Sequence, residues 1–286
     1  MTPAARTALA AARAARFILV ARELGLDVGK LGDVTGLFGD ALADEAEVTI
    51  DPRGTRASLA APWPHDADAR ARIAEMLGER IHVLEQRKAR PVIELVLDGG
   101  FLEVAATSHA AAPLAEDVVR ASRELPAFAR ESLRRLAGLL VDPAHASQCD
   151  GVRSTASGLA LRFRRTDDAA TLAALIEAAG ELGVTAAQRK LVEDIHPVIG
   201  RQRTTVLSLH ACETGLALEV SWPDIAWENV VRVATGLYGK AVGARIGALA
   251  GASGAPHASA LHLLLGDREP PRALVSARIV ATDSVQ

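Results

Sequence analysis

Nine charged or histidine side chains fall on one face of a series of predicted β-strands. Successive residues of a strand point to opposite sides of its sheet, and these strands alternate apolar with polar residues. The residues expected together on the polar face are Glu94, Glu103, Arg153, Arg162, His210, Glu219, His262, Arg272 and Arg278. Ionisable groups enclosed by a barrel are costly unless they are paired or hydrated, so this face predicts a ligand-binding cavity.

An open, curved sheet is the alternative interpretation of the same alternation. Its polar face would meet solvent, where charged side chains need no ligand. A single histidine on a strand, such as His210 or His262, is also more often a satisfied polar neighbour than a catalytic base. The alternation by itself leaves both interpretations open.

The strands come from five predicted hairpins, each turning on glycine or proline. The last four recur at intervals of about 57 residues, which is typical of a repeated supersecondary unit. The repeat is visible in the letters of Gly158-Leu-Ala-Leu-Arg-Phe and Gly215-Leu-Ala-Leu-Glu-Val. Ten such strands can close into one barrel without exposed edges. The predicted hairpins are Glu47–Trp63, Val92–Thr107, Val152–Arg165, Thr204–Ser221 and Ala258–Ala281.

Helical periodicity fills the segments between the hairpins. Amphipathic helices need an apolar surface to cover, so we expect them outside the sheet, on its apolar face. Prolines should end several of them, as Pro197 does after Ile195. An apolar stripe from Phe17 to Leu24 indicates a further helix near the N-terminus. The other predicted helices are Ala67–Leu84, Leu114–Leu125, Ala127–Leu140, Ala169–Leu182, Ala186–Ile195, Asp224–Tyr238 and Lys240–Ala250.

These elements predict an α+β protein with a single ten-stranded antiparallel β-barrel. Five αββα repeats would build the barrel, with the helices outside, in one domain over residues 1–286. A chain of 286 residues that is 49% hydrophobic can bury a core of that size.

Composition excludes several classes of protein. A net charge of −3 gives no general attraction for nucleic acid or acidic membranes. The two cysteines, Cys149 and Cys212, are too few for a disulfide framework and lack zinc spacing, so we expect reduced thiols in the cytoplasm. No apolar run reaches the roughly 18 residues of a membrane span. The sequence also lacks the P-loop, dinucleotide, zinc-protease and nucleophile-elbow motifs.

Short motifs along nearly the whole chain carry a family resemblance. They are Glu23-Leu-Gly-Leu, Leu37-Phe-Gly-Asp-Ala-Leu, the Gly99-Gly100-Phe101 turn, Glu181-Leu-Gly-Val, Glu213-Thr-Gly and Arg272-Ala-Leu-Val-Ser-Ala-Arg-Ile. With the order of elements, they resemble the soluble aromatic prenyltransferases that have the αββα barrel, in their small bacterial branch. That family forms a ten-stranded barrel from five such units, with a solvent-filled centre.

The resemblance implies transfer of an isoprenoid group from its diphosphate to an aromatic small molecule, without a cofactor. Basic side chains hold the leaving diphosphate in such a site, and aromatic walls shield the allylic cation. Glu219 or Glu103 would orient the acceptor or take its proton. The substrate-binding residues that the resemblance implies are Arg162, Arg201, Arg203, Ser208, His210, Arg272 and Arg278, with Arg201 and Arg203 as alternatives for one position.

The sequence departs from the family pattern in four respects. Leu102 and Glu103 stand where the family usually has a lysine, and Ser157-Gly158 stands near another expected phosphate contact. The first hairpin lacks the acidic residue that some members use for magnesium, which predicts a metal-independent site. Aromatic residues are only 3%, and the one tyrosine, Tyr238, is expected on a helix. Two alternatives follow: a non-catalytic relative that uses the barrel for small-molecule binding or as a scaffold, or a helix-covered open sheet that binds a protein.

Overall fold

The computed structural model describes most of the predicted strands and five long helices. It describes residues 1–31, 34–78, 91–98, 101–108, 148–155, 158–165, 176, 180, 183–199, 205–212, 215–266 and 271–280. The predicted helices Leu114–Leu125 and Ala127–Leu140 lie outside these residues, as do most of Ala169–Leu182 and the end of Ala67–Leu84.

The strands form one antiparallel sheet that curves back on itself. Each strand pairs with its neighbours in the sequence, and β1 pairs with both β2 and β10, which closes the sheet. The prediction of a mixed helix and strand protein with a curved antiparallel sheet is therefore confirmed. The strands are β1 Glu47–Ile50, β2 Arg56–Pro62, β3 Val92–Asp98, β4 Phe101–Ser108, β5 Gln148–Thr155, β6 Gly158–Arg165, β7 Thr205–Cys212, β8 Gly215–Ala226, β9 His257–Leu265 and β10 Arg272–Arg278.

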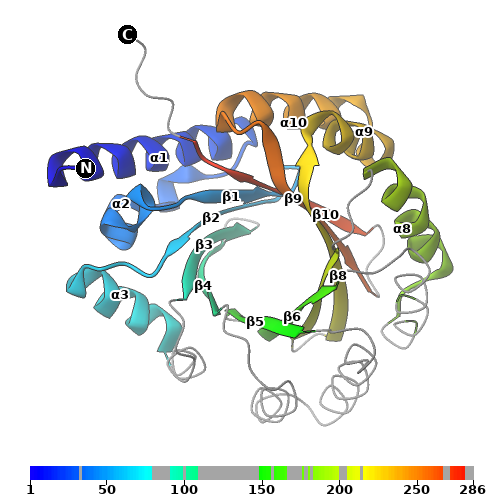
Figure 1. Ribbon diagram of the computed structural model, residues 1–286, viewed down its shortest axis with the longest axis horizontal. Coiled ribbons are helices and arrows are strands. Elements are labelled where there is room, and N and C mark those ends of the chain that lie inside the picture. Colours follow the sequence, from blue (N-terminus) through cyan, green and yellow to red (C-terminus); the bar gives the residue numbers. More distant parts are fainter. Residues whose placement is uncertain are drawn as a thin grey trace.

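The described helices lie outside the ring of strands, as Figure 1 shows. The first is capped by Thr2, whose Oγ1 accepts a hydrogen bond from the Ala5 N–H at 3.3 Å, and it begins with a proline. The third is capped by Asp66, which accepts from the Ala69 N–H at 2.8 Å. The helices are α1 Pro3–Glu23, α2 Val34–Phe38, α3 Ala67–Leu77, α8 Ala186–Ile199, α9 Trp227–Tyr238 and α10 Lys240–Ser253, with short 3₁₀ turns at Val28–Leu31 and Gly39–Ala43.

Two element boundaries differ from the predicted ones. Helix α8 continues through Pro197 to Ile199, so the predicted end at Ile195 is wrong. A proline in the last turn removes only one helical hydrogen bond, and burial of the Ile199 side chain against the core favours the extra turn. Strand β8 continues to Ala226, where it pairs with His257, so α9 begins three residues later than the predicted start at Asp224.

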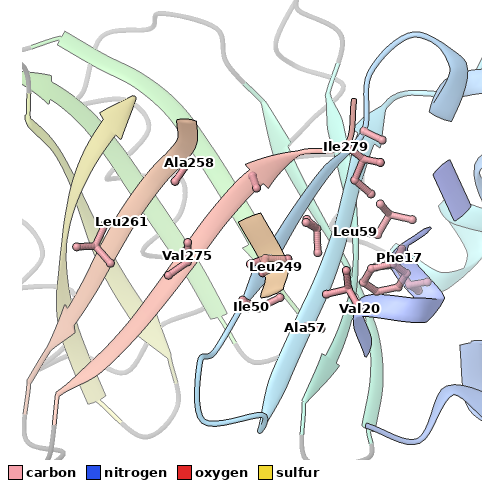
Figure 2. Close-up of a cluster of buried hydrophobic side chains, with 14 of the residues drawn as sticks. Phe17, Val20, Ile50, Ala57, Leu59, Leu249, Ala258, Leu261, Val275 and Ile279 are labelled. Carbon is pink, nitrogen blue, oxygen red and sulfur yellow. The ribbon is translucent and has the colours of Figure 1, made fainter. Parts of the chain in front are cut away.

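The hydrophobic core lies between the helices and the outer face of the sheet. Figure 2 shows Phe17 and Val20 of α1 and Leu249 of α10 beside Ile50 of β1 and Val275 of β10. Complete burial of a side chain such as Phe17 contributes roughly 1.5–3 kcal/mol. Because alternate residues of each strand face this core, the remaining residues face the inside of the closed sheet, here called the lumen face.

Candidate functional site

Strand register brings the predicted polar residues onto the lumen face. Directly paired residues of neighbouring strands point to the same side of a sheet. One row of such pairs joins Arg272, Leu264, Glu219, Ser208 and Arg162 across β10 to β6. Five strands thus contribute one continuous strip of side chains to the lumen face.

A network of polar side chains crosses one half of this face. We call Thr49, His210, Glu219, Ser221, His262 and Ser276 the histidine–glutamate network. Glu219 Oε2 lies 2.9 Å from His210 Nε2, and its Oε1 lies 3.0 Å from His262 Nδ1. Ser221 donates to the same Oε1 at 2.8 Å. Strands β7, β8 and β9 therefore meet at one carboxylate.

The network continues from His262 to the first strand. His262 Nε2 lies 2.8 Å from Ser276 Oγ, which in turn lies 2.7 Å from Thr49 Oγ1. All the distances along this path from Glu219 to Thr49 are those of good hydrogen bonds. The network thus spans β7, β8, β9, β10 and β1 without a gap.

The charge of Glu219 determines the direction of these hydrogen bonds. Burial by itself raises the pKa of this carboxyl, but the hydrogen bonds and charges of His210 and His262 outweigh it and hold the pKa well below its ordinary value. An ionised carboxylate can only accept hydrogen bonds. His210 Nε2 and His262 Nδ1 therefore both carry a proton, and the opposite nitrogen of each ring, when neutral, is left as an acceptor.

Four arginines and three carboxylates occupy another part of the lumen face and the turn between β1 and β2. We call Asp51, Arg53, Arg56, Glu94, Asp98, Arg153 and Arg272 the arginine cluster. Arg153 holds Glu94 through two nitrogens, at 2.6 and 2.8 Å from the same oxygen. Burial alone would raise the pKa of Glu94, and the charges of Arg153 and Arg56 lower it below its ordinary value.

Arg272 is held by two aspartates at the hairpin end of the barrel. Its Nε lies 2.9 Å from Asp51 Oδ2, and its Nη1 lies 3.3 Å from Asp98 Oδ2. The Asp51 side chain is 0% exposed and also accepts from Arg53 at 2.9 Å and from Thr55 at 2.8 Å. Arg272 is therefore a firmly positioned cation that already has anionic partners.

Arg56 of β2 is the least satisfied cation of the cluster. Its side chain is only 20% exposed, yet its nearest carboxylate oxygens lie at 3.7 Å on Asp98 and 4.0 Å on Glu94. Its Nε is buried without a hydrogen-bond partner. Burial, and then repulsion by the Arg153 guanidinium, lower the pKa of Arg56. Such a group favours an additional anion beside it.

The amino-acid sequence alone did not single out Arg56, although a signal was present. Strand alternation places Arg56 on the same face as Ser58, and Arg56 pairs with Asp98 across the sheet. The strand reads Arg56-Ala-Ser-Leu-Ala-Ala, where small residues dilute the contrast between the two faces.

The other predicted site residues are distributed more widely. Glu103 of β4 pairs with Val96 on the lumen face, and Ser208 of β7 is buried opposite Glu219. Arg278 lies at the far end of β10, six residues or about 20 Å from Arg272. Its side chain is 70% exposed, with its Nε 3.5 Å from Glu45, so it does not join the arginine cluster. Arg201 and Arg203 lie outside the described residues.

Tyr238 lies on a helix, as predicted, and its hydroxyl hydrogen-bonds to the backbone at the start of β10. Its hydroxyl donates to the Pro271 carbonyl at 3.1 Å and accepts from the Ala273 N–H at 2.8 Å. The Arg53 guanidinium lies 5.4 Å from the centre of its ring. Tyr238 thus fixes the start of β10, next to Arg272.

Two further kinds of site are absent from the described residues. That part of the chain contains no group of three or more His, Cys, Asp or Glu side chains arranged to hold a metal ion. None of its helices combines the length and the apolar character that crossing a membrane requires.

The fold is that of the aromatic prenyltransferases that have a β-barrel surrounded by helices. No known family model matches the sequence, and no curated protein matches it. Solved structures do match. PriB, in a binary complex with product diphosphate, aligns with a TM-score of 0.63 over 94% of this chain and 96% of its own, at 16% identity.

Two further solved structures have the same fold. AnaPT from Neosartorya fischeri aligns with a TM-score of 0.72 over 94% of this chain and 92% of its own, at 11% identity. 5-Dimethylallyltryptophan synthase from Streptomyces coelicolor aligns with a TM-score of 0.63 over 94% and 97%, at 13% identity. PriB was also solved with L-tryptophan and dimethylallyl thiolodiphosphate. At these identities the similarity is one of fold.

Proposed function

We propose that this chain is an aromatic prenyltransferase, which transfers an isoprenoid group from its diphosphate to an aromatic small molecule. It would do so in one barrel domain of five αββα repeats over residues 1–286. The observation that carries the proposal is Arg56, a buried cation with an unpartnered Nε beside Arg153 and Arg272. An anion at this position would relieve the repulsion among three guanidinium groups.

The arginine cluster supplies what a departing diphosphate needs. Fixed positive charges in an enclosed site stabilise negative charge as it develops on a leaving group. Arg272 is positioned by Asp51 and Asp98, and Arg153 by Glu94, so neither must reorganise when the ligand arrives. Arg162 faces the same lumen and adds positive charge, and Arg201 or Arg203 is proposed for the same role.

Glu219 is the proposed acceptor-binding carboxylate. Its Oε1 already accepts hydrogen bonds from Ser221 and His262, whereas its Oε2 accepts one from His210. Because each carboxylate oxygen can accept two hydrogen bonds, Oε2 retains a position for an N–H or O–H group of an aromatic ring. Electron density released by that hydrogen bond makes the ring a better nucleophile toward the allylic carbon. Ser208 and Glu103 face the same space.

We expect the reaction to need neither metal nor cofactor, since the cations of the site are arginines. We also propose a cytoplasmic location, in keeping with two cysteines that are too few for a disulfide framework, and no nucleic-acid or membrane partner, since a net charge of −3 gives no general attraction for nucleic acid or acidic membranes.

Calorimetry with dimethylallyl and geranyl diphosphate, with and without EDTA, tests donor binding. Turnover with a panel of indoles and phenols, followed by mass spectrometry, tests transfer. We expect binding that EDTA does not change and a prenylated product. Binding without any product would instead favour a small-molecule-binding relative, and no binding under either condition would contradict the proposal.

A further inference from the structure

Three members of the histidine–glutamate network are arranged as an activated serine. Ser276 Oγ lies 2.8 Å from His262 Nε2, and His262 Nδ1 lies 3.0 Å from Glu219 Oε1. The three side chains come from β10, β9 and β8, and all of them face the lumen. A hydroxyl, an imidazole and a carboxylate in this order form the constellation that activates serine nucleophiles on unrelated folds.

The proton positions agree with that role. Glu219 is a carboxylate and can only accept, so His262 presents its Nδ1–H to Glu219, and in its neutral form the ring presents its Nε2 lone pair to Ser276. The Ser276 hydroxyl therefore donates to His262 Nε2. Ser221 contacts both Glu219 Oε1 and His262 Nδ1 at 2.8 Å, which restrains the imidazole from the side.

We propose that Ser276 is a nucleophile and that the barrel hydrolyses small carboxylic esters or thioesters. Ser276 Oγ adds to the carbonyl carbon while its proton passes to His262 Nε2. The bond to the alcohol or thiol then breaks, and His262 returns the proton to that leaving group. Water, deprotonated by the same nitrogen, cleaves the acyl-serine to release the acid and restore the hydroxyl.

Thr49 completes the site on the opposite side of Ser276. Its Oγ1 lies 2.7 Å from Ser276 Oγ and, with the Ser276 proton directed to His262, it is the donor of that pair. A hydroxyl in this position can turn to the oxyanion that forms on the attacked carbonyl. Ser276 is only 4% exposed, which restricts the substrates to short acyl groups that enter through the lumen.

A fluorophosphonate probe tests the proposal, since it reacts with activated serines. The intact chain is labelled, and the modified residue is located by peptide mass spectrometry. We expect the label on Ser276, none in Ser276→Ala, and a labelling rate lowered at least about 100-fold in His262→Gln. Ser58→Ala, which removes another buried serine of the lumen face, should label at the rate of the unchanged chain.

Two results overturn the proposal: a folded chain without label on Ser276, or His262→Gln labelled as fast as the unchanged chain. Should His262→Gln fail to fold by circular dichroism, the pH dependence of labelling of the unchanged chain decides. A labelling rate that rises with pH supports a base that must first lose its proton, and a flat profile contradicts it. The probe needs no isoprenoid diphosphate, so failure here leaves the proposed prenyl transfer untouched.

Discussion

The arginine cluster and the histidine–glutamate network share one lumen face and differ in how fully their charges are satisfied. In the network, every hydrogen bond from Glu219 to Thr49 measures 2.7 to 3.0 Å. In the cluster, Arg56 is 3.7 and 4.0 Å from its carboxylates. Buried charges without close partners are costly. The hydrogen bonding of the arginine cluster is therefore incomplete, whereas that of the histidine–glutamate network is complete.

This difference assigns the two regions different tasks. The cluster has an excess of cations that a bound anion would satisfy. The network has a single carboxylate whose donors fix its position and its proton pattern. Substitutions in the network should therefore affect chemistry, and substitutions in the cluster should affect binding and stability.

The Glu219→Gln substitution should have the largest effect, a decrease in turnover. The amide keeps the shape of the side chain but removes the charge that takes up or polarises an acceptor proton, so kcat should fall by about 10²- to 10⁴-fold. Calorimetric affinity for dimethylallyl diphosphate should change much less than kcat, because Glu219 hydrogen-bonds to residues of the network and acts on the cluster only through its charge, at Arg153. A variant that loses donor affinity and keeps kcat would reverse the division between the two regions.

Arg56→Ala should give the next largest effect, on donor binding. A charged hydrogen bond to phosphate in such an enclosed site would contribute about 1.5–3 kcal/mol. Since each 1.4 kcal/mol corresponds to tenfold, the dissociation constant for the diphosphate should rise roughly 10- to 100-fold. Arg22→Ala, an exposed arginine on α1, is the matched control. Equal affinity in the two variants would remove Arg56 from the site.

Arg272→Ala, compared with Arg56→Ala, tests which arginine of the cluster stabilises the fold. It leaves Asp51 buried with only Arg53 and Thr55 as side-chain partners, so the free energy of unfolding should fall by about 1.5–3 kcal/mol. Arg56→Ala breaks no close ion pair and should leave that free energy nearly unchanged. Urea denaturation of both variants measures the contrast. If Arg56→Ala were the more destabilising change, Arg56 would be a structural cation.

Sequence alternation was sufficient for the curved antiparallel sheet and for the side of it on which several polar residues lie. Side chains on a strand alternate with a strict period of two, so the lumen-face positions of Glu94, His210 and Glu219 follow from local pattern. Partners across the barrel do not follow from it. Arg272 and Asp51 are 221 positions apart, and only strand register brings them together.

The residues that were missed carry only a weak local signal. Arg56 is identified by the distances to its neighbours, which depend on three strands. Ser276 and Thr49 are small and uncharged, and their importance appears only when His262 lies between Ser276 and Glu219. Pro197 was misjudged for a related reason, because burial of the next residues outweighs a local preference.

Acid should produce the smallest effect, a progressive loss of stability. The pKa values of Asp51, Glu94 and Glu219 are all lowered in the folded chain: burial opposes the lowering at each, and it is outweighed by hydrogen bonds to Arg53 at Asp51, by the charge of Arg153 at Glu94 and by hydrogen bonds to the histidines at Glu219. A lowered folded pKa stabilises the protein above the unfolded pKa, near pH 4, and this stabilisation is lost as pH falls through the folded pKa.

Thermal melts from about pH 7 to 3 measure this acid sensitivity and divide it between the two regions. Glu219→Gln removes the network's share, so its melting temperature should fall less steeply below about pH 4 than that of the unchanged chain. The remaining slope belongs to Asp51 and Glu94 of the arginine cluster. Glu228→Gln, on an exposed face of α9, should leave the slope as it was. Identical slopes for all three proteins would mean that His210 and His262 do not stabilise the Glu219 carboxylate in the folded chain. A carboxylate that its partners stabilise must lose that stabilisation when acid protonates it.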